Sequence, residues 1–230
     1  MDIKELSLVN PDQHWYYQSK LFALRRVLNR YKPDARSFID VGAGSGFFAR
    51  NLADFEAGDQ AICVDPNYSK ESQEFEGALR FTRTPPAQAA DAYLLIDVLE
   101  HVPDEYELLR PYLASAQPGA IFVATVPAFM SMWSAHDVFL EHYRRYTLRS
   151  ISQVCMESQL TVVHGRYLFG SVFPAAWFVR RLQRNSSANS SMKPLPQPLN
   201  AVLKRLVKAE HRCSSNRLAG ISALVVAVQP

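Results

Sequence analysis

A glycine-rich run marks the first place where this chain could bind a small molecule. Gly42, Gly44 and Gly46 alternate with small residues, and Asp40 precedes the first glycine by two positions. Glycine lets the backbone approach a ligand closely, and a helix that begins there offers free N–H groups. A dinucleotide-binding fingerprint would need Gly or Ala where Phe47 stands, and the Gly-Lys-Ser/Thr of a P-loop is absent. Asp40, two residues before the first glycine, lies where it could salt-bridge or hydrogen-bond an amino-acid head group.

A second carboxylate follows the next apolar run. Asp65 comes directly after Ala61–Val64 and is followed by Pro66. An acidic side chain at the end of a buried strand can accept hydrogen bonds from both hydroxyls of a ribose. Aspartate at a strand end is also an ordinary turn former. Its combination with the glycine run favours the ribose contact.

A third group of polar residues follows the apolar run Ala92–Ile96. Asp97, Glu100 and His101 come first, and His142 lies further along the chain. If the first segment is helical, Asp97 and His101 lie one turn apart. Carboxylates and imidazoles that converge can bind a divalent cation, and a histidine can act as a general base. Two structural alternatives stay open: Glu100 caps or salt-bridges, and His101 is a hydrogen-bonded core residue.

Two arginines next to His142 suggest an anionic group on the second substrate. Guanidinium groups of Arg144 and Arg145 would suit phosphate or carboxylate. The alternative is that they form salt bridges with Glu141 or Asp137.

Alternating helical and extended patterns must position these groups. Helical spacing of apolar residues predicts helices at 19–31, 47–53, 105–114, 147–158 and 199–212. Short apolar runs predict strands at 37–41, 61–64, 79–82, 92–96, 121–126, 160–163 and 221–228. Strands that alternate with helices predict an α/β fold, with a mostly parallel sheet and helices on both faces.

Length and charge limit the organisation of the chain. Its 230 residues predict one domain, 1–230, with an N-terminal cap segment at 1–32. Residues 1–137 carry 12 basic and 19 acidic side chains, whereas residues 138–230 carry 13 and 3. The basic part favours an anionic partner such as phospholipid, a phosphorylated substrate or nucleic acid. The alternative is that these side chains decorate solvated helices.

An apolar and basic arm at 166–215 precedes the last predicted strand, with a flexible loop at 185–198 inside it. Its apolar stretch, Leu168–Val179, is too short to span a bilayer and contains Gly170 and Pro174. Aromatic residues flanked by arginines suit a membrane interface, and a helix packed on the sheet or a dimer contact is the alternative. With three scattered cysteines and no signal peptide, we expect a cytoplasmic protein that contacts the inner membrane surface peripherally. The sequence carries no signal for an oligomeric state.

These motifs together resemble class I S-adenosylmethionine-dependent methyltransferases, over roughly residues 10–230. The glycine-rich run matches the first motif of the family, and the segment Ile96–Val102 matches its fourth-strand motif. The resemblance implies a Rossmann-like, seven-stranded, mostly parallel sheet whose last strand is antiparallel. It implies S-adenosyl-L-methionine as cofactor, bound by Asp40, Gly42, Gly44, Gly46, Asp65, Pro66 and Asp97.

Two further cofactor contacts follow from this resemblance. The family often has an acidic or amide side chain near the third strand for the adenine amino group, and Gln88 is the residue we expect there. In similar bacterial enzymes an aromatic segment like His14-Trp15-Tyr16-Tyr17 closes over the cofactor, so Trp15 is expected at the site. The alternative for Trp15 is a hydrophobic staple at the start of a helix.

The acceptor side resembles two groups of metal-dependent O-methyltransferases, those of ubiquinone biosynthesis and those that modify the 3′ end of small RNAs. Both carry E-x-x-E-H and a later histidine, where this chain has Asp97 at the first position. The resemblance implies a divalent metal, Mg²⁺ or Zn²⁺, on Asp97, Glu100, His101 and His142. The alternative is a metal-free site in which His142, His101 and Asp97 are the catalytic residues, with a histidine as general base.

We therefore expect a methyltransferase that acts on an oxygen of a small-molecule, sugar or lipid-linked acceptor. Bacterial enzymes similar to this chain often accompany glycosyltransferases of surface-polysaccharide synthesis. One alternative is an RNA methyltransferase that uses the basic C-terminal part, although no RNA-binding motif is present and nucleic acid is not the expected partner. The other is a non-catalytic protein that binds S-adenosylmethionine.

Overall fold

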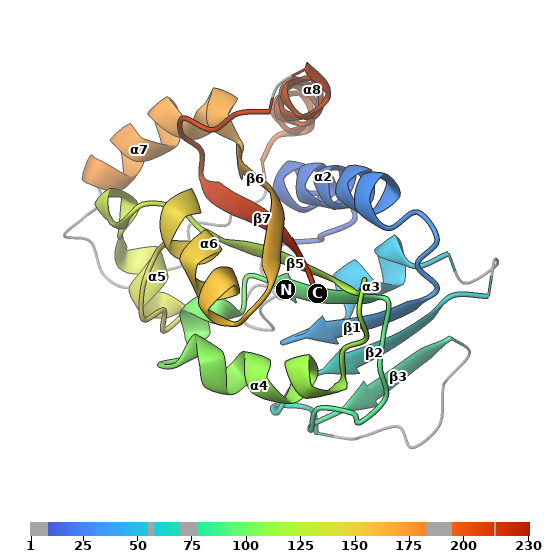
Figure 1. Cartoon of the computed structure of the whole chain (residues 1–230). Helices are drawn as coiled ribbons and strands as arrows, with labels where there is room; N and C mark the ends of the chain where they lie inside the picture. The colour runs from blue at the N-terminus through green and yellow to red at the C-terminus, as the bar shows by residue number, and fades with distance from the viewer. Residues whose placement is uncertain (1–8, 55–57, 70–77, 183–194, 214) are drawn as a thin grey trace.

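The computed structural model describes residues 9–54, 58–69, 78–182, 195–213 and 215–230. Seven strands form one sheet in the order β3-β2-β1-β4-β5-β7-β6 (Figure 1). They are β1 (Ser37–Val41), β2 (Gln60–Val64), β3 (Leu79–Thr82), β4 (Ala92–Ile96), β5 (Ile121–Pro127), β6 (Thr161–Leu168) and β7 (Ser222–Val228). β7 pairs antiparallel with β5 and β6, and the other pairs are parallel. The expected α/β sheet with an antiparallel last strand is confirmed.

The central strands are largely apolar because helices cover both faces of the sheet. Every residue of β4 is buried, and β1 is buried after its first residue. Strands of this kind show no apolar–polar alternation, since no side of them meets water. β3 lies at the sheet edge and is only half-buried.

Helices alternate with the strands along the chain. They are α2 (Trp15–Tyr31), α3 (Phe47–Leu52), α4 (Glu105–Ser115), α5 (Ala135–Phe139), α6 (Leu148–Glu157), α7 (Phe173–Leu182) and α8 (Gln197–Cys213). Short 3-10 turns lie at η2 (Leu99–His101), η3 (Met130–Met132) and η4 (Gly170–Val172). Side chains fix two of the helix starts: Asp104 accepts the N–H of Tyr106 at α4, and Thr147 accepts that of Ser150 at α6.

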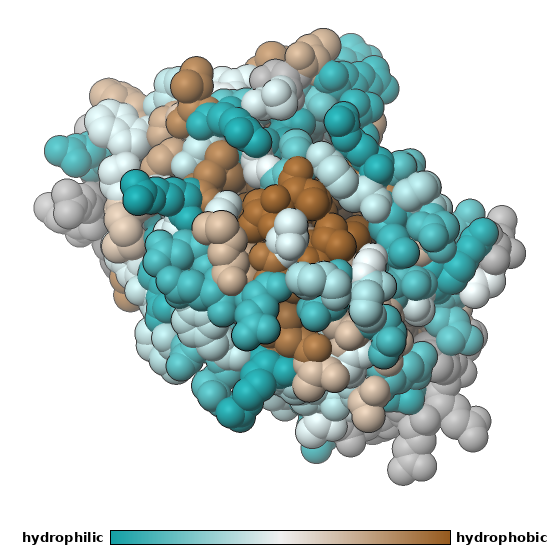
Figure 2. All heavy atoms as spheres, viewed as in Figure 1, coloured by the Kyte–Doolittle hydropathy of each residue, from teal (hydrophilic) through white to brown (hydrophobic). Residues whose placement is uncertain are grey.

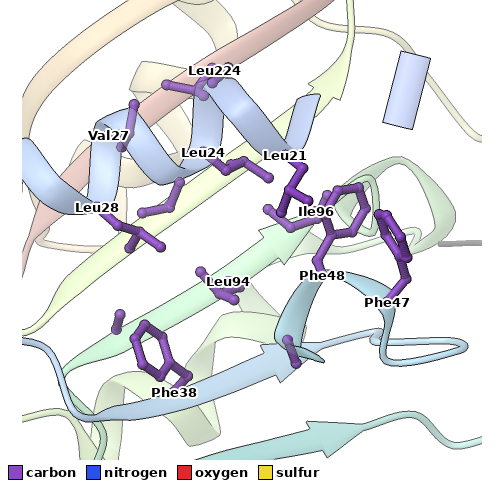
Figure 3. Close-up of a cluster of buried hydrophobic side chains, with 14 of the residues drawn as sticks. Leu21, Leu24, Val27, Leu28, Phe38, Phe47, Phe48, Leu94, Ile96 and Leu224 are labelled. Atoms are coloured by element: carbon purple, nitrogen blue, oxygen red, sulfur yellow. The ribbon is translucent and has the colours of Figure 1, made fainter. Parts of the chain in front are cut away.

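Helix α2 supplies much of the core on one face of the sheet. Its Leu21, Leu24 and Leu28 lie over the strands, next to Leu94 of β4 and Leu224 of β7 (Figure 3). Each fully buried leucine contributes about 1.5–3 kcal/mol relative to an exposed one. Helices α4 and α6 pack against the opposite face in a second cluster. The core therefore consists of two apolar layers, with the sheet between them.

Helix α8 lies against α2 rather than directly on the sheet, as Figure 1 shows. Val207 and His211 are its buried residues. The loop expected at 185–198 ends earlier than predicted, because Gln197 and Pro198 already open α8. Residues 185–194 of that loop, and residues 1–8 of the expected cap segment, lie outside the described residues.

Apolar side chains are exposed on the two C-terminal helices. Phe178 and Val179 of α7 are exposed, as are Leu199, Val202 and Leu206 of α8. In the part of the chain that the structure describes, no helix has the length and apolar character needed to cross a membrane. On the face in Figure 2, apolar residues also gather over the middle, where β6 and β7 lie in Figure 1, with hydrophilic residues around them.

Candidate functional site

The glycine-rich loop lies where β1 and β2 end side by side. The backbone N–H groups of Gly42 and Ala43 donate to the carbonyl of Val64 at 2.8 and 3.1 Å. The Gly44 N–H donates to Oδ2 of Asp65 at 2.9 Å. The carboxyl ends of neighbouring parallel strands are the usual place for ligands in this kind of sheet. These bonds hold the loop and Asp65 as one unit at that edge.

Gly42 also contacts the turn that follows β4. Its φ is +66°, a left-handed conformation that favours glycine, and a Cβ there would overlap the side chain of Val98. The loop after β1 and the turn after β4 are therefore in close contact. This contact brings the segment that carries Asp97, Glu100 and His101 beside the glycines.

Asp40 is buried beneath this loop, with only 2% of its surface exposed. Its Oδ2 atom has no hydrogen-bond partner among the described residues. Burial raises the pKa of Asp40 to about 6, and the nearby charge of Asp65 acts in the same direction. A buried carboxylate with a free oxygen can accept a hydrogen bond from a cationic ligand group.

The other residues expected to contact the cofactor differ in burial and in their neighbours. Asp65 is buried and also accepts the N–H of Asn67 at 2.9 Å, while Pro66 is exposed beside it. Gln88 is exposed in the segment between β3 and β4. Trp15 begins α2, and its side chain lies edge-on to Phe169, with 5.8 Å between the ring centroids. Its backbone N–H donates to Oδ1 of Asn200 at 2.8 Å.

Asp97 forms an ion pair with Lys20 of α2, a residue that the sequence analysis did not select. Thr125 of β5 donates to the other carboxylate oxygen of Asp97 at 3.0 Å. Asp97 has a φ of +52°, a left-handed conformation that an aspartate adopts more readily than most residues. Both of its oxygens are thus engaged, and Asp97 anchors the turn after β4.

Lys20 is fully buried, and its pKa depends on its two neighbours. Burial alone would lower the pKa of Lys20, but the charge of Asp97 and the Tyr16 hydroxyl raise it above its ordinary value. The ammonium also lies 4.7 Å from the centroid of the Tyr16 ring. A sequence signal existed for Lys20, because it lies on the same helical stripe as the buried Tyr17 and Leu24.

Glu100, His101 and His142 converge at the end of β4. One ligand-type atom of each lies within 4.8 Å of those of the other two. The two imidazole rings meet edge to face, with 4.6 Å between centroids. Glu100 is buried, its Oε2 has no hydrogen-bond partner among the described residues, and burial and then Asp97 raise its pKa well above the ordinary value. Asp97 itself is not part of this cluster.

Asp137 fixes the orientation of His142, a role that the sequence analysis did not assign. Its Oδ1 lies 3.0 Å from His142 Nδ1, and Arg145 donates to it at 2.6 Å. Burial alone would raise the pKa of Asp137, but the His142 hydrogen bond and the Arg145 charge lower it below the ordinary range. The ionised carboxylate keeps the proton on Nδ1, which leaves Nε2 as the basic nitrogen.

The two arginines beside His142 are engaged in structural contacts. Arg145 is buried and pairs with Asp137, so the salt-bridge alternative is confirmed for it. Arg144 pairs with Glu105 at 2.7 Å and donates to the carbonyl of Pro103. The expectation that this pair binds an anionic acceptor is therefore wrong, since acidic residues of the chain already occupy both guanidinium groups.

A comparison with protein families shows the family to which the chain belongs. A methyltransferase-domain model matches residues 13–165. The chain belongs to the methyltransferase domain family. This methyltransferase-family chain is also similar to an uncharacterized methyltransferase of Mycobacterium leprae (strain Br4923), with 34% identity over 122 residues. That alignment covers 48% of this chain and 44% of the relative, so the chain spans less than half the length of that relative.

Solved structures share the fold of this family member. A 1,6-didemethyltoxoflavin-N1-methyltransferase of Burkholderia thailandensis, solved with bound 1,6-didemethyltoxoflavin and S-adenosylhomocysteine, has a TM-score of 0.57 and 17% identity. The match covers 93% of this chain and 80% of that one. An S-adenosylmethionine-dependent methyltransferase of Archaeoglobus fulgidus has a TM-score of 0.53 and 16% identity, over 90% and 94% of the chains.

S-adenosylmethionine is the cofactor that this family implies. The residues present fit it in two respects. Asp40 offers a buried, unpartnered carboxylate oxygen for a cationic head group. Gly42 lies where any side chain would overlap Val98, so the loop keeps a bare backbone beside the strand ends.

Proposed function

We propose that this chain transfers a methyl group from S-adenosylmethionine to an oxygen of a small-molecule, sugar or lipid-linked acceptor. The observation that supports this is the position of Glu100, His101 and His142 beside the glycine-rich loop. A cofactor held over that loop and an acceptor at the histidines would then be neighbours. Methyl transfer needs such an in-line arrangement of donor and acceptor more than it needs covalent help from the protein.

Each group at the cofactor end has a proposed role. The carboxylate of Asp40 accepts hydrogen bonds from the head-group ammonium, and Asp65 accepts them from the ribose hydroxyls. Pro66, Gln88 and Trp15 are proposed as contacts around the adenosine part, as the family resemblance implies. The bound cofactor supplies an electrophilic sulfonium methyl group.

His142 is the proposed general base on the acceptor side. As the hydroxyl oxygen of the acceptor forms its bond to the methyl carbon, its proton passes to Nε2 of His142. Asp137 supports this by holding the proton on Nδ1 and stabilising the imidazolium that results. The methyl carbon–sulfur bond breaks as the methyl carbon–oxygen bond forms, and the bonding electrons stay on sulfur.

A divalent metal at Glu100, His101 and His142 is the second candidate for this site. Two imidazoles and a carboxylate with a free oxygen are a donor set that suits Zn²⁺ and also binds Mg²⁺ or Mn²⁺. The structure removes Asp97 from this set because Lys20 and Thr125 occupy it. A bound metal would lower the pKa of an acceptor hydroxyl and replace the general base.

One experiment tests the proposed function and the class of acceptor. Purified protein is incubated with labelled S-adenosylmethionine and a host-cell extract, and the label is measured in lipid, RNA and aqueous small-molecule fractions. Label in lipid or small molecules that is lost in His142→Gln supports the proposal, and label in RNA or none at all contradicts it. EDTA with Mg²⁺ or Zn²⁺ re-addition separates the metal from the metal-free mechanism.

The exposed apolar residues of α7 and α8 support a lipid-linked acceptor. Phe178, Val179 and Val202 expose apolar side chains on helices that also carry arginines. Such helices bind a bilayer surface by burying the apolar side chains beneath the head groups. We therefore propose peripheral contact with a membrane through these two helices. Sedimentation with anionic vesicles that is lost in Phe178→Ser would support this contact, and no sedimentation of the wild type would contradict it.

A further inference from the structure

A second candidate site lies away from the glycine-rich loop, between α2, α8, β6 and β7. It is a cavity of about 210 Å³. A water molecule takes up about 30 Å³ in the liquid, so the cavity has room for a hydrated small anion. Ala23, Val27 and Leu224 contribute apolar surface to it. Its basic side chains are Arg26, Arg30, His164, Arg166, His211 and Arg212.

Basic side chains outnumber acidic ones in and around this cavity. No acidic side chain lines it, and none of its arginines has an ion-pair partner among the described residues. The nearby carboxylate of Glu210 is already occupied by the N–H groups of Gly170 and Ser171, each at 2.8 Å. Clustered cations that outnumber their acidic neighbours repel one another, so an anion between them would be stabilised.

Two residues that line the cavity each have a buried nitrogen without a hydrogen-bond partner in the part of the chain that the structure describes. Nε of Arg166 and Nε2 of His211 lack hydrogen bonds among the described residues, although the two residues are 9% and 2% exposed. Arg166 contacts His211 through Nη2, which lies 3.4 Å from His211 Nδ1. Since a guanidinium can only donate, Nδ1 is the acceptor and Nε2 carries the proton. Native proteins seldom leave such donors unpaired, so a ligand that supplied an acceptor to either donor would be favoured.

The surroundings keep His211 neutral. Burial and then the charge of Arg166 lower the pKa of His211 to about 4, while burial and Arg166 also lower that of His164. A neutral His211 is a donor at Nε2 throughout the physiological range. The cavity thus combines one neutral and one charged buried donor with arginines at its mouth.

We propose that this cavity binds a phosphoryl group, with Arg166 Nε and His211 Nε2 as buried donors and Arg26 and Arg30 as flanking charges. Guanidinium groups match the geometry and charge of phosphate oxygens. The site is separate from the methyl-transfer edge, because Arg30 lies ten residues beyond Lys20 on α2, about 15 Å along the helix. The phosphoryl group belongs either to a free phosphorylated compound or to a lipid head group.

Calorimetry with inorganic phosphate at constant ionic strength tests the site on the whole chain. We expect binding of one phosphate per chain, weakened about tenfold by Arg26→Gln or Arg30→Gln. These two arginines are exposed, so their variants should fold. Arg149→Gln, an exposed change on α6 with the same loss of charge, should bind as the wild type does. No phosphate binding, or equal weakening in Arg149→Gln, would overturn the proposal.

Vesicles distinguish the two sources of the phosphoryl group. A lipid head group would be assigned if the protein sediments with phosphatidic acid vesicles but not with vesicles of phosphatidylcholine alone. This sedimentation should be lost in Arg26→Gln and Arg30→Gln. Phosphate binding without such a difference would assign a free phosphorylated compound. S-adenosylhomocysteine binding, measured on the same variants, should be unchanged, so that failure at this cavity is distinguishable from failure at the cofactor site.

Discussion

The ammonium of Lys20 and the carboxylate of Asp97 join helix α2 to the turn after β4. Lys20 is fully buried in the folded chain, whereas 30% of the Asp97 side chain is exposed. The two partners therefore differ in what remains when the other is removed. If Lys20 is removed, water can reach the remaining carboxylate of Asp97. If Asp97 is removed, the buried ammonium of Lys20 has neither a counter-charge nor access to water.

This difference predicts unequal effects of the two single substitutions. Asp97→Asn should lower the free energy of unfolding by about 3–5 kcal/mol, as for other buried pairs broken on one side. Lys20→Met should lower it by about 1–3 kcal/mol, because the remaining carboxylate is only partly desolvated. The double variant should recover most of the loss, and urea denaturation of the ligand-free protein measures all four forms. Additive effects of the two changes would argue against the pair.

Gly42 should tolerate no side chain. Gly42→Ala would place a Cβ in a left-handed conformation and against Val98, so we expect a loss of more than about 2 kcal/mol and no measurable S-adenosylhomocysteine binding. Gly58→Ala is the matched control, because Gly58 has a φ of +89° and open space around it. That variant should lose only about 1–2 kcal/mol.

A second substitution tests the cause of the Gly42 effect. If overlap with Val98 adds to the backbone strain, Val98→Ala should restore part of the stability of Gly42→Ala. Equal losses in Gly42→Ala and Gly58→Ala would show that only backbone strain acts at Gly42.

The sequence predicted the strands well because they are buried on both faces. Runs such as Ala92–Ile96 are apolar throughout and end at polar residues, so both their type and their bounds are visible locally. β6 continues to Leu168, beyond the predicted 160–163, because pairing with β7 carries the polar His164 and Arg166 into the sheet. That pairing is a long-range property which a local pattern does not show.

The site was only partly predictable for the same reason. Asp40, the glycines and Asp65 lie in short segments at strand ends, so their spacing was enough to predict that they meet at one edge of the sheet. Their contacts with the cofactor stay a prediction. Lys20 and Asp137 act on residues through contacts that depend on the tertiary fold, and nothing in the spacing connects Lys20 to Asp97. Charge counting predicted an anionic partner for the C-terminal part, but the basic cavity also needs α2.

Asp40 should make stability depend on pH in the mildly acidic range. Its folded pKa is raised to about 6 from an ordinary 3.8, so between these values the folded chain holds a proton that the unfolded chain releases. The Asp40 contribution to stability therefore falls as pH rises from about 4 to about 6. Asp40→Asn should remove this part of the slope in urea titrations across that range. A slope identical to that of the wild type would contradict the raised pKa.

The titration of Asp40 should also affect cofactor binding, but there the affinity should rise with pH whereas the stability falls. Only the ionised carboxylate attracts the head-group ammonium, so affinity for S-adenosylhomocysteine should rise as pH increases through about 6. Asp40→Asn should bind more weakly and show no rise there. Calorimetry between pH 5 and 7.5 gives the affinity of each protein and its change with pH. If the affinity of Asp40→Asn still rises with pH, the titration belongs to another group.

Asp65 should increase the affinity for S-adenosylhomocysteine by accepting hydrogen bonds from the ribose hydroxyls, and not only by holding the glycine-rich loop. Its oxygens already accept N–H groups of Gly44 and Asn67, so Asp65→Ala would also loosen the glycine-rich loop. A ligand-side change separates the two roles. Wild-type protein should bind S-adenosylhomocysteine more tightly than its 2′-deoxy analogue by about 1.5–3 kcal/mol, the range for a hydrogen bond to a charged group. Asp65→Ala should bind both ligands weakly and equally. If the variant keeps the full preference for the hydroxylated ligand, another residue makes the ribose contact, and Asp65 serves only to fix the loop.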